Sequence, residues 1–166
     1  MNKDTIYIGN DHGGYETKVQ ILKQLDELGI PYVDCGCNST EIVRYPYYAA
    51  QVSSAVSTGK ASRGILICST GIGMSILANK YPNVRASVCT STYMGRMTRA
   101  HNNSNILCLG GKITGIFEIL DILNAWLTTD YDGGRHAISL GLMAEAEQCL
   151  AATGNWEPEV PEEGKQ

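Results

Sequence analysis

Short apolar runs alternate with longer amphipathic segments along most of the chain. The apolar runs have the length and composition of buried strands and lie at residues 5–8, 31–35, 64–68, 84–89 and 105–109. Between them, apolar residues recur at helical spacing, as at Val19, Leu22 and Leu25. This pattern predicts helices at residues 15–28, 47–57, 74–80, 93–100, 116–127 and 143–151.

The regular alternation of strand and helix predicts the fold class. It is typical of a parallel sheet covered by helices on both faces. The right-handed crossover rule then gives an α/β three-layer sandwich around five parallel strands. We expect one domain over residues 1–152 and a mobile polar tail over residues 153–166, which holds two prolines and four glutamates.

Composition narrows the possible functions. The 166 residues are 43% hydrophobic and carry a net charge of −4 without a basic block, which argues against nucleic acid as the main partner. No apolar run reaches the roughly 20 residues that span a bilayer, and the polar residues 1–5 do not resemble a secretory signal. The six cysteines are too few, in so apolar a chain, to indicate a disulfide scaffold. We expect reduced thiols in a cytoplasmic protein with no metal.

The most suggestive local motif follows the third predicted strand. Ligands of such sheets bind beyond the carboxyl ends of the strands, so we expect chemistry in the loops after strands one, three and four. The turn 69–73 contains two glycines and two hydroxyl residues and leads into a helix. Exposed amides there favour an anion and the thiolate form of Cys68. A tight turn beside a structural cysteine remains the alternative.

Three further positions carry candidate chemistry. Asp11 and His12 follow the first strand, His101 follows the helix at residues 93–100, and Arg135 follows two glycines. Asp11 and His12 suit substrate binding, His101 suits acid–base transfer and Arg135 suits phosphate binding. We expect all four at the carboxyl edge of the sheet with Cys68. The alternatives are a helix cap for Asp11 and solvated side chains for the others. No GxGxxG turn and no phosphate-binding GxxxxGK[ST] loop is present, which argues against hydride transfer and nucleotide hydrolysis.

Longer segments resemble one family. The segments are GNDHGGYETK, RYPYYAAQV, GILICSTGIGMSILANKYPNVRASVC, YMGRMTRAHNNSNILCLGGKITG and DYDGGRHA, between residues 6 and 136. They are similar to the ribose-5-phosphate isomerase B family, which includes the galactose-6-phosphate isomerase subunits. The resemblance implies a Rossmann-like sandwich, no cofactor, and a homodimer or homotetramer whose active sites are shared between subunits.

The resemblance also implies roles for individual residues. Cys68 matches the base that moves a proton between C1 and C2 of the open-chain sugar, and Thr70 matches an assisting hydroxyl. His101 matches the residue that opens the furanose ring from the second subunit. The implied substrate contacts are Asp11, His12, Tyr45, Ser69, Gly71, Ile72, Gly73, Asn102, Lys112 and Arg135.

Four positions depart from the usual family pattern, and because of them the identity of the substrate is not decided by the resemblance. Ser139 and Lys112 stand where arginines are common, Arg44 stands where an aspartate is usual, and Ser69 replaces a glycine. Isomerisation of ribose 5-phosphate is the leading hypothesis. The same chemistry on a hexose 6-phosphate of allose or galactose type, or on a free aldose, is the second. A non-catalytic sugar-phosphate-binding subunit is a third hypothesis, and a nucleotide-binding module is a weaker fourth.

Overall fold

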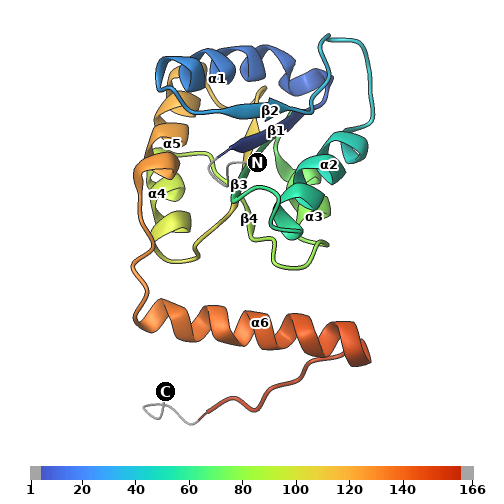
Figure 1. Ribbon diagram of the computed structural model, residues 1–166, viewed down its shortest axis with the longest axis vertical. Helices are drawn as coiled ribbons and strands as arrows, with labels where there is room; N and C mark the ends of the chain where they lie inside the picture. Colours follow the sequence, from blue (N-terminus) through green and yellow to red (C-terminus); the bar gives the residue numbers. More distant parts are fainter. Residues whose placement is uncertain (1–4, 162–166) are drawn as a thin grey trace. The chain divides into compact units, whose positions relative to one another are not determined.

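The computed structural model describes residues 5–161 and divides the chain into two compact units (Figure 1). The first unit extends to Asp132, and the second begins at Gly133. Among residues 5–161, no helix combines the length and the apolar character needed to cross a membrane. The elements that position the candidate site lie in the first unit.

A five-stranded parallel sheet forms the centre of the first unit, as the sequence predicts. Its strands lie in the order β2-β1-β3-β5-β4. Every neighbouring pair is parallel. The strands are β1 (Ile6–Asn10), β2 (Tyr32–Asp34), β3 (Arg63–Cys68), β4 (Ala86–Val88) and β5 (Ile106–Gly110).

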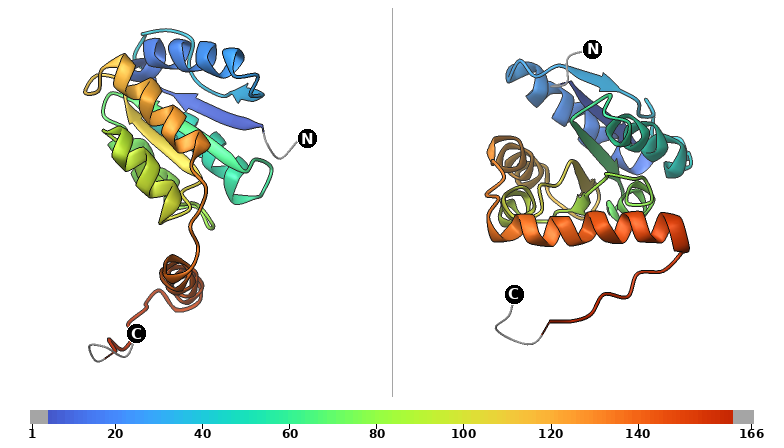
Figure 2. Two further views of the ribbon diagram at one scale, coloured as in Figure 1. Left: turned by 90° about the vertical axis from the view of Figure 1, so that its left-hand side faces the viewer. Right: turned by 60° about the horizontal axis from the view of Figure 1, so that its bottom comes forward.

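Helices cover both faces of this sheet, which confirms the predicted three-layer sandwich (Figures 1 and 2). One face packs on α1 (Tyr15–Glu27) and α5 (Ile116–Thr128), and α4 (Thr92–Ala100) lies against α5. The other face packs on α2 (Tyr45–Ser57) and α3 (Ile72–Ala78). The short 3-10 helix η1 (His12–Gly14) follows β1. Each face of the sheet thus has its own apolar core.

An ion pair between a buried lysine and a more exposed aspartate fixes the loop that follows β2. Lys18 is 1% exposed, and its Nζ lies 2.8 Å from Oδ2 of Asp34. The same ammonium group donates to the carbonyl of Cys37 and to Oδ1 of Asn38, each at 2.8 Å. Helix α1 therefore holds the start of the long loop that leads to α2.

The second unit contains α6 (Arg135–Thr153), which begins eight residues earlier than the sequence pattern predicts. Residues 135–142 mix polar and apolar side chains around the helix, so no single apolar face reveals its first two turns. No side chain of α6 is buried. The predicted boundaries of the domain (1–152) and the mobile tail (153–166) remain predictions, and residues 162–166 lie outside the described part.

Candidate active site

A cavity of about 470 Å³ opens at the carboxyl edge of the sheet. Its walls come from the loop after β1 and from the segment that enters α2. The lining residues are Asp11, His12, Val43, Arg44, Tyr45, Pro46 and Tyr47. Parallel sheets of this kind bind ligands at this edge, so the cavity is the first candidate site.

The thiol of Cys68 lies in a tightly folded turn at the same edge of the sheet as this cavity. Cys68 ends β3 with 6% of its surface exposed, and its Sγ accepts a hydrogen bond from the amide of Gly71 at 3.0 Å. Gly71 has a φ of 79°, and an added Cβ would lie 3.0 Å from the backbone of Leu109. Only glycine meets both conditions without strain. The hydroxyl of Thr70 accepts from the amide of Ile72 at 3.3 Å.

Two close approaches join this turn to the cavity wall. A Cβ placed on Gly73 would lie 2.9 Å from Cζ of Tyr45, so the phenol ring covers the start of α3. A Cβ on Gly13 would collide with the hydroxyl of Ser69. The loops after β1, β2 and β3 therefore form one continuous site.

The loop after β5 also joins the site through its backbone. The amide of Gly111 donates to the carbonyl of Cys68 at 2.8 Å, and the amide of Lys112 donates to the carbonyl of Ser69 at 3.1 Å. These bonds place the backbone of Lys112 next to the turn, and its proposed role in phosphate binding stays a prediction. Its side chain is exposed.

The two polar residues after β1 have different local roles. Oδ1 of Asp11 accepts from the amide of Gly13 at 2.9 Å, which is the capping role weighed from the sequence, and Asp11 also lines the cavity. Nδ1 of His12 accepts from the amide of Val43 at 3.3 Å. In the neutral ring, Nε2 then carries the proton. His12 is thus set up as a hydrogen-bond donor.

The other core cysteines have different surroundings from Cys68. Burial raises the pKa of Cys89 to about 12 and also raises the pKa of Cys108, whose thiol is fully enclosed. A thiol held in its neutral form is a poor nucleophile and a poor base. All six cysteines are free. The sulfur of Cys68 accepts a hydrogen bond from a backbone amide, and that of Cys37 accepts one from the side-chain amide of Asn10.

His101 does not lie on the carboxyl side of its own chain, and this corrects the expectation that the candidate groups gather there. Helix α4 runs back toward the amino edge, where Asn105 accepts a hydrogen bond from Gly64 near the start of β3. His101 caps the end of α4 there. At about 3.3 Å per residue, β3 separates this edge from Cys68 by roughly 16 Å.

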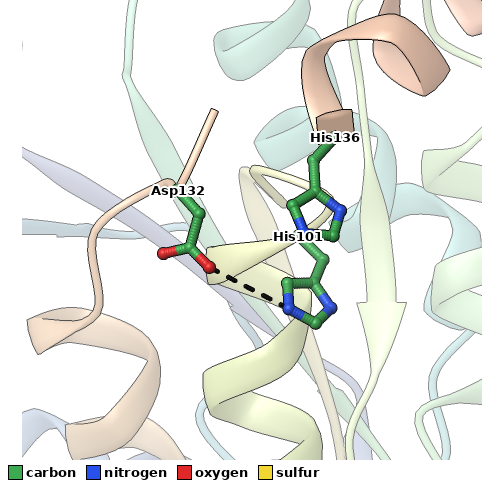
Figure 3. A group of neighbouring side chains, drawn as sticks. All are labelled: His101, Asp132 and His136. Atoms are coloured by element: carbon green, nitrogen blue, oxygen red, sulfur yellow. Dashed lines mark ion pairs between the residues drawn. The ribbon is translucent and has the colours of Figure 1, made fainter. Parts of the chain in front are cut away.

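Asp132 faces His101 at this opposite edge (Figure 3). Nε2 of His101 lies 3.9 Å from Oδ2 of Asp132, and the Asp132 amide donates to the carbonyl of Ala100 at 2.9 Å. Zinc sites in proteins use three or four protein ligands, so this pair by itself does not define a metal centre.

The structure thus brings together most of the predicted site residues of the first unit. These are Asp11, His12, Tyr45, Cys68, Ser69, Thr70, Gly71, Ile72, Gly73 and Lys112. His101 and Asn102 lie at the amino edge instead. Arg135 is the first residue of α6 in the second unit.

Sequence reasoning missed part of the cavity wall. It selected the loops after strands one, three and four, but β4 is an edge strand on the far side from β1, and its loop does not line the cavity. The loop after β2 lines it instead through Val43 and Arg44, and the first turn of α2 lines it through Pro46 and Tyr47. The signal was available, because the carboxyl end of β2 lies at the same edge as the others.

The fold and the site define a Rossmann-like α/β protein with a small-molecule site built around a thiol. A model of the Ribose/Galactose Isomerase family matches residues 6–142. Ribose-5-phosphate isomerase B of Escherichia coli is 41% identical over 143 residues, which cover 86% of this chain and 96% of that protein. D-erythrulose-4-phosphate isomerase of Pectobacterium atrosepticum is 37% identical over 80% of this chain and 88% of its own length.

A solved structure agrees with these relatives. Ribose-5-phosphate isomerase B of Clostridium thermocellum superimposes with a TM-score of 0.85 at 46% identity and covers 87% of this chain and 97% of its own. The chain belongs to the ribose/galactose isomerase family, as the sequence motifs indicate. It is an aldose–ketose isomerase.

Proposed function

We propose that this enzyme interconverts ribose 5-phosphate and ribulose 5-phosphate, with Cys68 as the base. The observation that carries the proposal is the hydrogen bond from the Gly71 amide to the Cys68 sulfur at the carboxyl edge of the sheet, where the cavity also opens. An amide donor stabilises negative charge on sulfur and keeps the thiol oriented. The names of the relatives support ribose 5-phosphate as the substrate.

The proposed reaction moves one proton between neighbouring carbons. The Cys68 thiolate removes the proton from C2 of the open-chain aldose, and the C2–H electrons form a C1=C2 bond as the C1 carbonyl becomes an enediolate oxygen. Nε2–H of His12 and the amides of the turn 69–73, other than those of Gly71 and Ile72, stabilise that oxygen. The thiol returns the proton to C1, while the proton of the C2 hydroxyl passes to the C1 oxygen, so that C2 becomes the ketone and C1 carries the hydroxyl.

An assay against a panel of sugars tests the proposed substrate. We expect the largest kcat/KM for ribose 5-phosphate among pentose, hexose and tetrose phosphates and the matching free sugars. The same chemistry on another aldose phosphate is the second candidate. It is supported by Arg44 in the cavity wall, by Lys112 and Ser139 at phosphate positions, and by the tetrose phosphate named for one relative. A tenfold preference for any other sugar, or no turnover at all, would reject ribose 5-phosphate.

We also propose that the enzyme is a homodimer, alone or paired into a tetramer, with active sites shared between subunits. His101, the proposed ring-opening residue, is separated from Cys68 of its own chain by the length of β3. Helix α6 offers an apolar surface for assembly, since it exposes Ile138, Leu142, Met143 and Leu150. A reducing cytoplasm suits the six free cysteines, and no step of the proposed reaction requires a cofactor.

Mixing two inactive variants tests the sharing of sites. Cys68→Ala and His101→Ala are each expected to be inactive on the furanose form of the substrate. In a mixed dimer, one site is rebuilt from the intact Cys68 of one chain and the intact His101 of the other. Random reassociation at equal amounts makes half the dimers mixed, so about a quarter of wild-type activity should return. A site formed within one chain would give no recovery, and that result would refute sharing.

A further inference from the structure

His101 stands at the C-terminal end of α4, and helices commonly fray at such ends. It is the C-cap residue of the helix, and its amide donates to the carbonyl of Met97 at 2.9 Å. The last carbonyl groups of a helix have no partner within it, so the final turn is held only by groups outside the helix. A misplacement of about 1 Å can lower a rate about a hundredfold. A side chain that opens a sugar ring therefore needs a support at this helix end.

The first half of α4 is fixed against α5. Oε1 of Glu118 accepts hydrogen bonds from the backbone amide and the hydroxyl of Thr92, at 2.6 and 2.9 Å. A Cβ on Gly95 would lie 2.9 Å from the carbonyl oxygen of Ile122, so the two helices are in close contact there. These contacts fix the start and the middle of the helix. They leave the orientation of its last turn to other residues.

Two arginines bind the three backbone carbonyls that follow His101. Nε of Arg85 donates to the carbonyls of Asn102 and Asn103 at 3.2 and 3.1 Å, and its Nη2 donates to the latter at 3.0 Å. Nη1 of Arg99 donates to the carbonyl of Ser104 at 2.6 Å. A guanidinium group carries its donors in a rigid planar fork, so these bonds restrict direction as well as distance. The chain after His101 is thus tied at three successive residues.

Asn103 gives this segment a backbone conformation that needs such support. Its φ is 44°, in the left-handed region, which asparagine adopts more readily than most residues but less readily than glycine. Its amide donates to the carbonyl of Arg99 at 3.1 Å, and its Oδ1 accepts from Nη1 of Arg99 at 3.0 Å. Arg99 therefore holds the turn after His101 through both the backbone and the side chain of Asn103.

The indole of Trp126 anchors this support in the core of the first unit. Trp126 and Ser104 are fully buried, and Nε1 of the indole donates to the hydroxyl of Ser104 at 2.9 Å. The guanidinium carbon of Arg99 lies over the same ring, 6.0 Å from its centre. An arginine stacked on a fixed aromatic ring has few orientations open to it. The position of Arg99 is therefore set by the core rather than by solvent.

We propose that Arg85 and Arg99 are positioning residues for the ring-opening step and that they act through His101. The inference rests on the ring-opening role proposed for His101 above. The imidazole keeps 37% of its side chain exposed, so it can meet a sugar, while the backbone that follows it is fixed by the two arginines. Neither guanidinium group touches the substrate in this role.

Histidine NMR of the full-length enzyme tests the positioning without any turnover. The chain has three histidines, so ¹³C labelling at Cε1 gives three signals, and His101→Ala assigns one of them. Arg99→Met keeps an aliphatic chain beside Trp126 and removes the donors, and Arg96→Met, at an exposed position of the same helix, is the matched control. We expect Arg99→Met to shift the His101 signal and to leave the signal of His12, at the opposite edge of the sheet, in place. Arg96→Met should leave both signals unchanged.

Kinetics on ribose 5-phosphate distinguish positioning from a general structural role. With the imidazole no longer held in one orientation, kcat of Arg99→Met should fall about 10- to 100-fold below that of wild type and of Arg96→Met. A residue that acts only through His101 has no further effect once His101 is absent. The residual rate of His101→Ala, which comes from sugar that has opened spontaneously, should therefore stay the same when Arg99→Met is added. A further loss in the double variant would show that Arg99 serves the fold at large and would reject the proposal.

A second variant keeps the proposal testable if Arg99→Met does not fold. Arg85→Met removes the donors to the carbonyls of Asn102 and Asn103 and should shift the same His101 signal. An unchanged His101 signal would overturn the proposal, and so would a shifted signal together with wild-type kcat on ribose 5-phosphate. If the wild-type enzyme does not turn over ribose 5-phosphate, the proposed substrate is wrong, and the NMR comparison still decides whether the two arginines hold His101.

Discussion

Replacement of Cys68 by alanine is expected to lower kcat by at least about a thousandfold, the order of magnitude at which a positioned base contributes. The substitution removes the sulfur at the carboxyl edge of the sheet and leaves the Gly71 amide without its acceptor. Initial rates of aldose–ketose conversion measure the effect. Cys35→Ala, at a half-buried thiol after β2, is the matched control and should keep most of the activity.

Binding should survive this change, because the cavity wall contains no atom of Cys68. The thermal stabilisation that a sugar phosphate gives to wild type should persist in Cys68→Ala. If Cys68→Ala turned over substrate at the wild-type rate, the base would have to be another residue. If it lost both turnover and binding, Cys68 would be a structural thiol of the turn.

The second large effect concerns stability. Lys18→Ala should lower the free energy of unfolding by about 1–3 kcal/mol, because the buried carbonyl of Cys37 loses its donor and the partly exposed Asp34 carboxylate loses its partner. Urea denaturation at neutral pH measures the change. Lys23→Ala is the control on the same helix, because its exposed ion pair with Glu27 spans 3.9 Å and should contribute less than about 1 kcal/mol.

The two lysine variants also distinguish an effect on stability from an effect on substrate binding. Lys18 anchors the loop that leads from β2 to the cavity wall. At a temperature at which both variants are folded, Lys18→Ala should therefore raise the KM for the sugar phosphate, whereas Lys23→Ala should not. Equal unfolding free energies for the two variants would mean that the buried ammonium group contributes no more than a surface charge.

The central strands could be predicted because they are buried on both faces. In β3 and β5, nearly every residue contacts a helical layer, so the sequence is a short continuous apolar run. The start of α6 could not be predicted in the same way. Its first two turns follow the glycines at 133 and 134 and bury no side chain, so no apolar face marks them.

The chemistry of the site was only partly visible in the sequence. The turn after Cys68 can be recognised in the sequence by Gly71, because this residue has a positive φ and lies against Leu109, and only glycine allows both. The position of His101 depends on the direction of α4, which local spacing does not encode. Arg63, Arg85 and Arg99 line one cavity at the amino edge of the sheet. No sequence motif connects these three residues, and the strand order brings them together.

Cys68 and His101 lie at opposite edges of the sheet, and the length of β3 separates them. Four of its six residues pair with both β1 and β5, and the two end residues, Arg63 and Cys68, each pair with one of them. The length of this part of the span is therefore fixed by backbone geometry. Loops at the carboxyl edge can therefore change in length and composition, and so alter which sugar fits, without altering that span. If the sites are shared as proposed, sugar specificity and the spacing between the thiol and the imidazole of one chain depend on different parts of that chain.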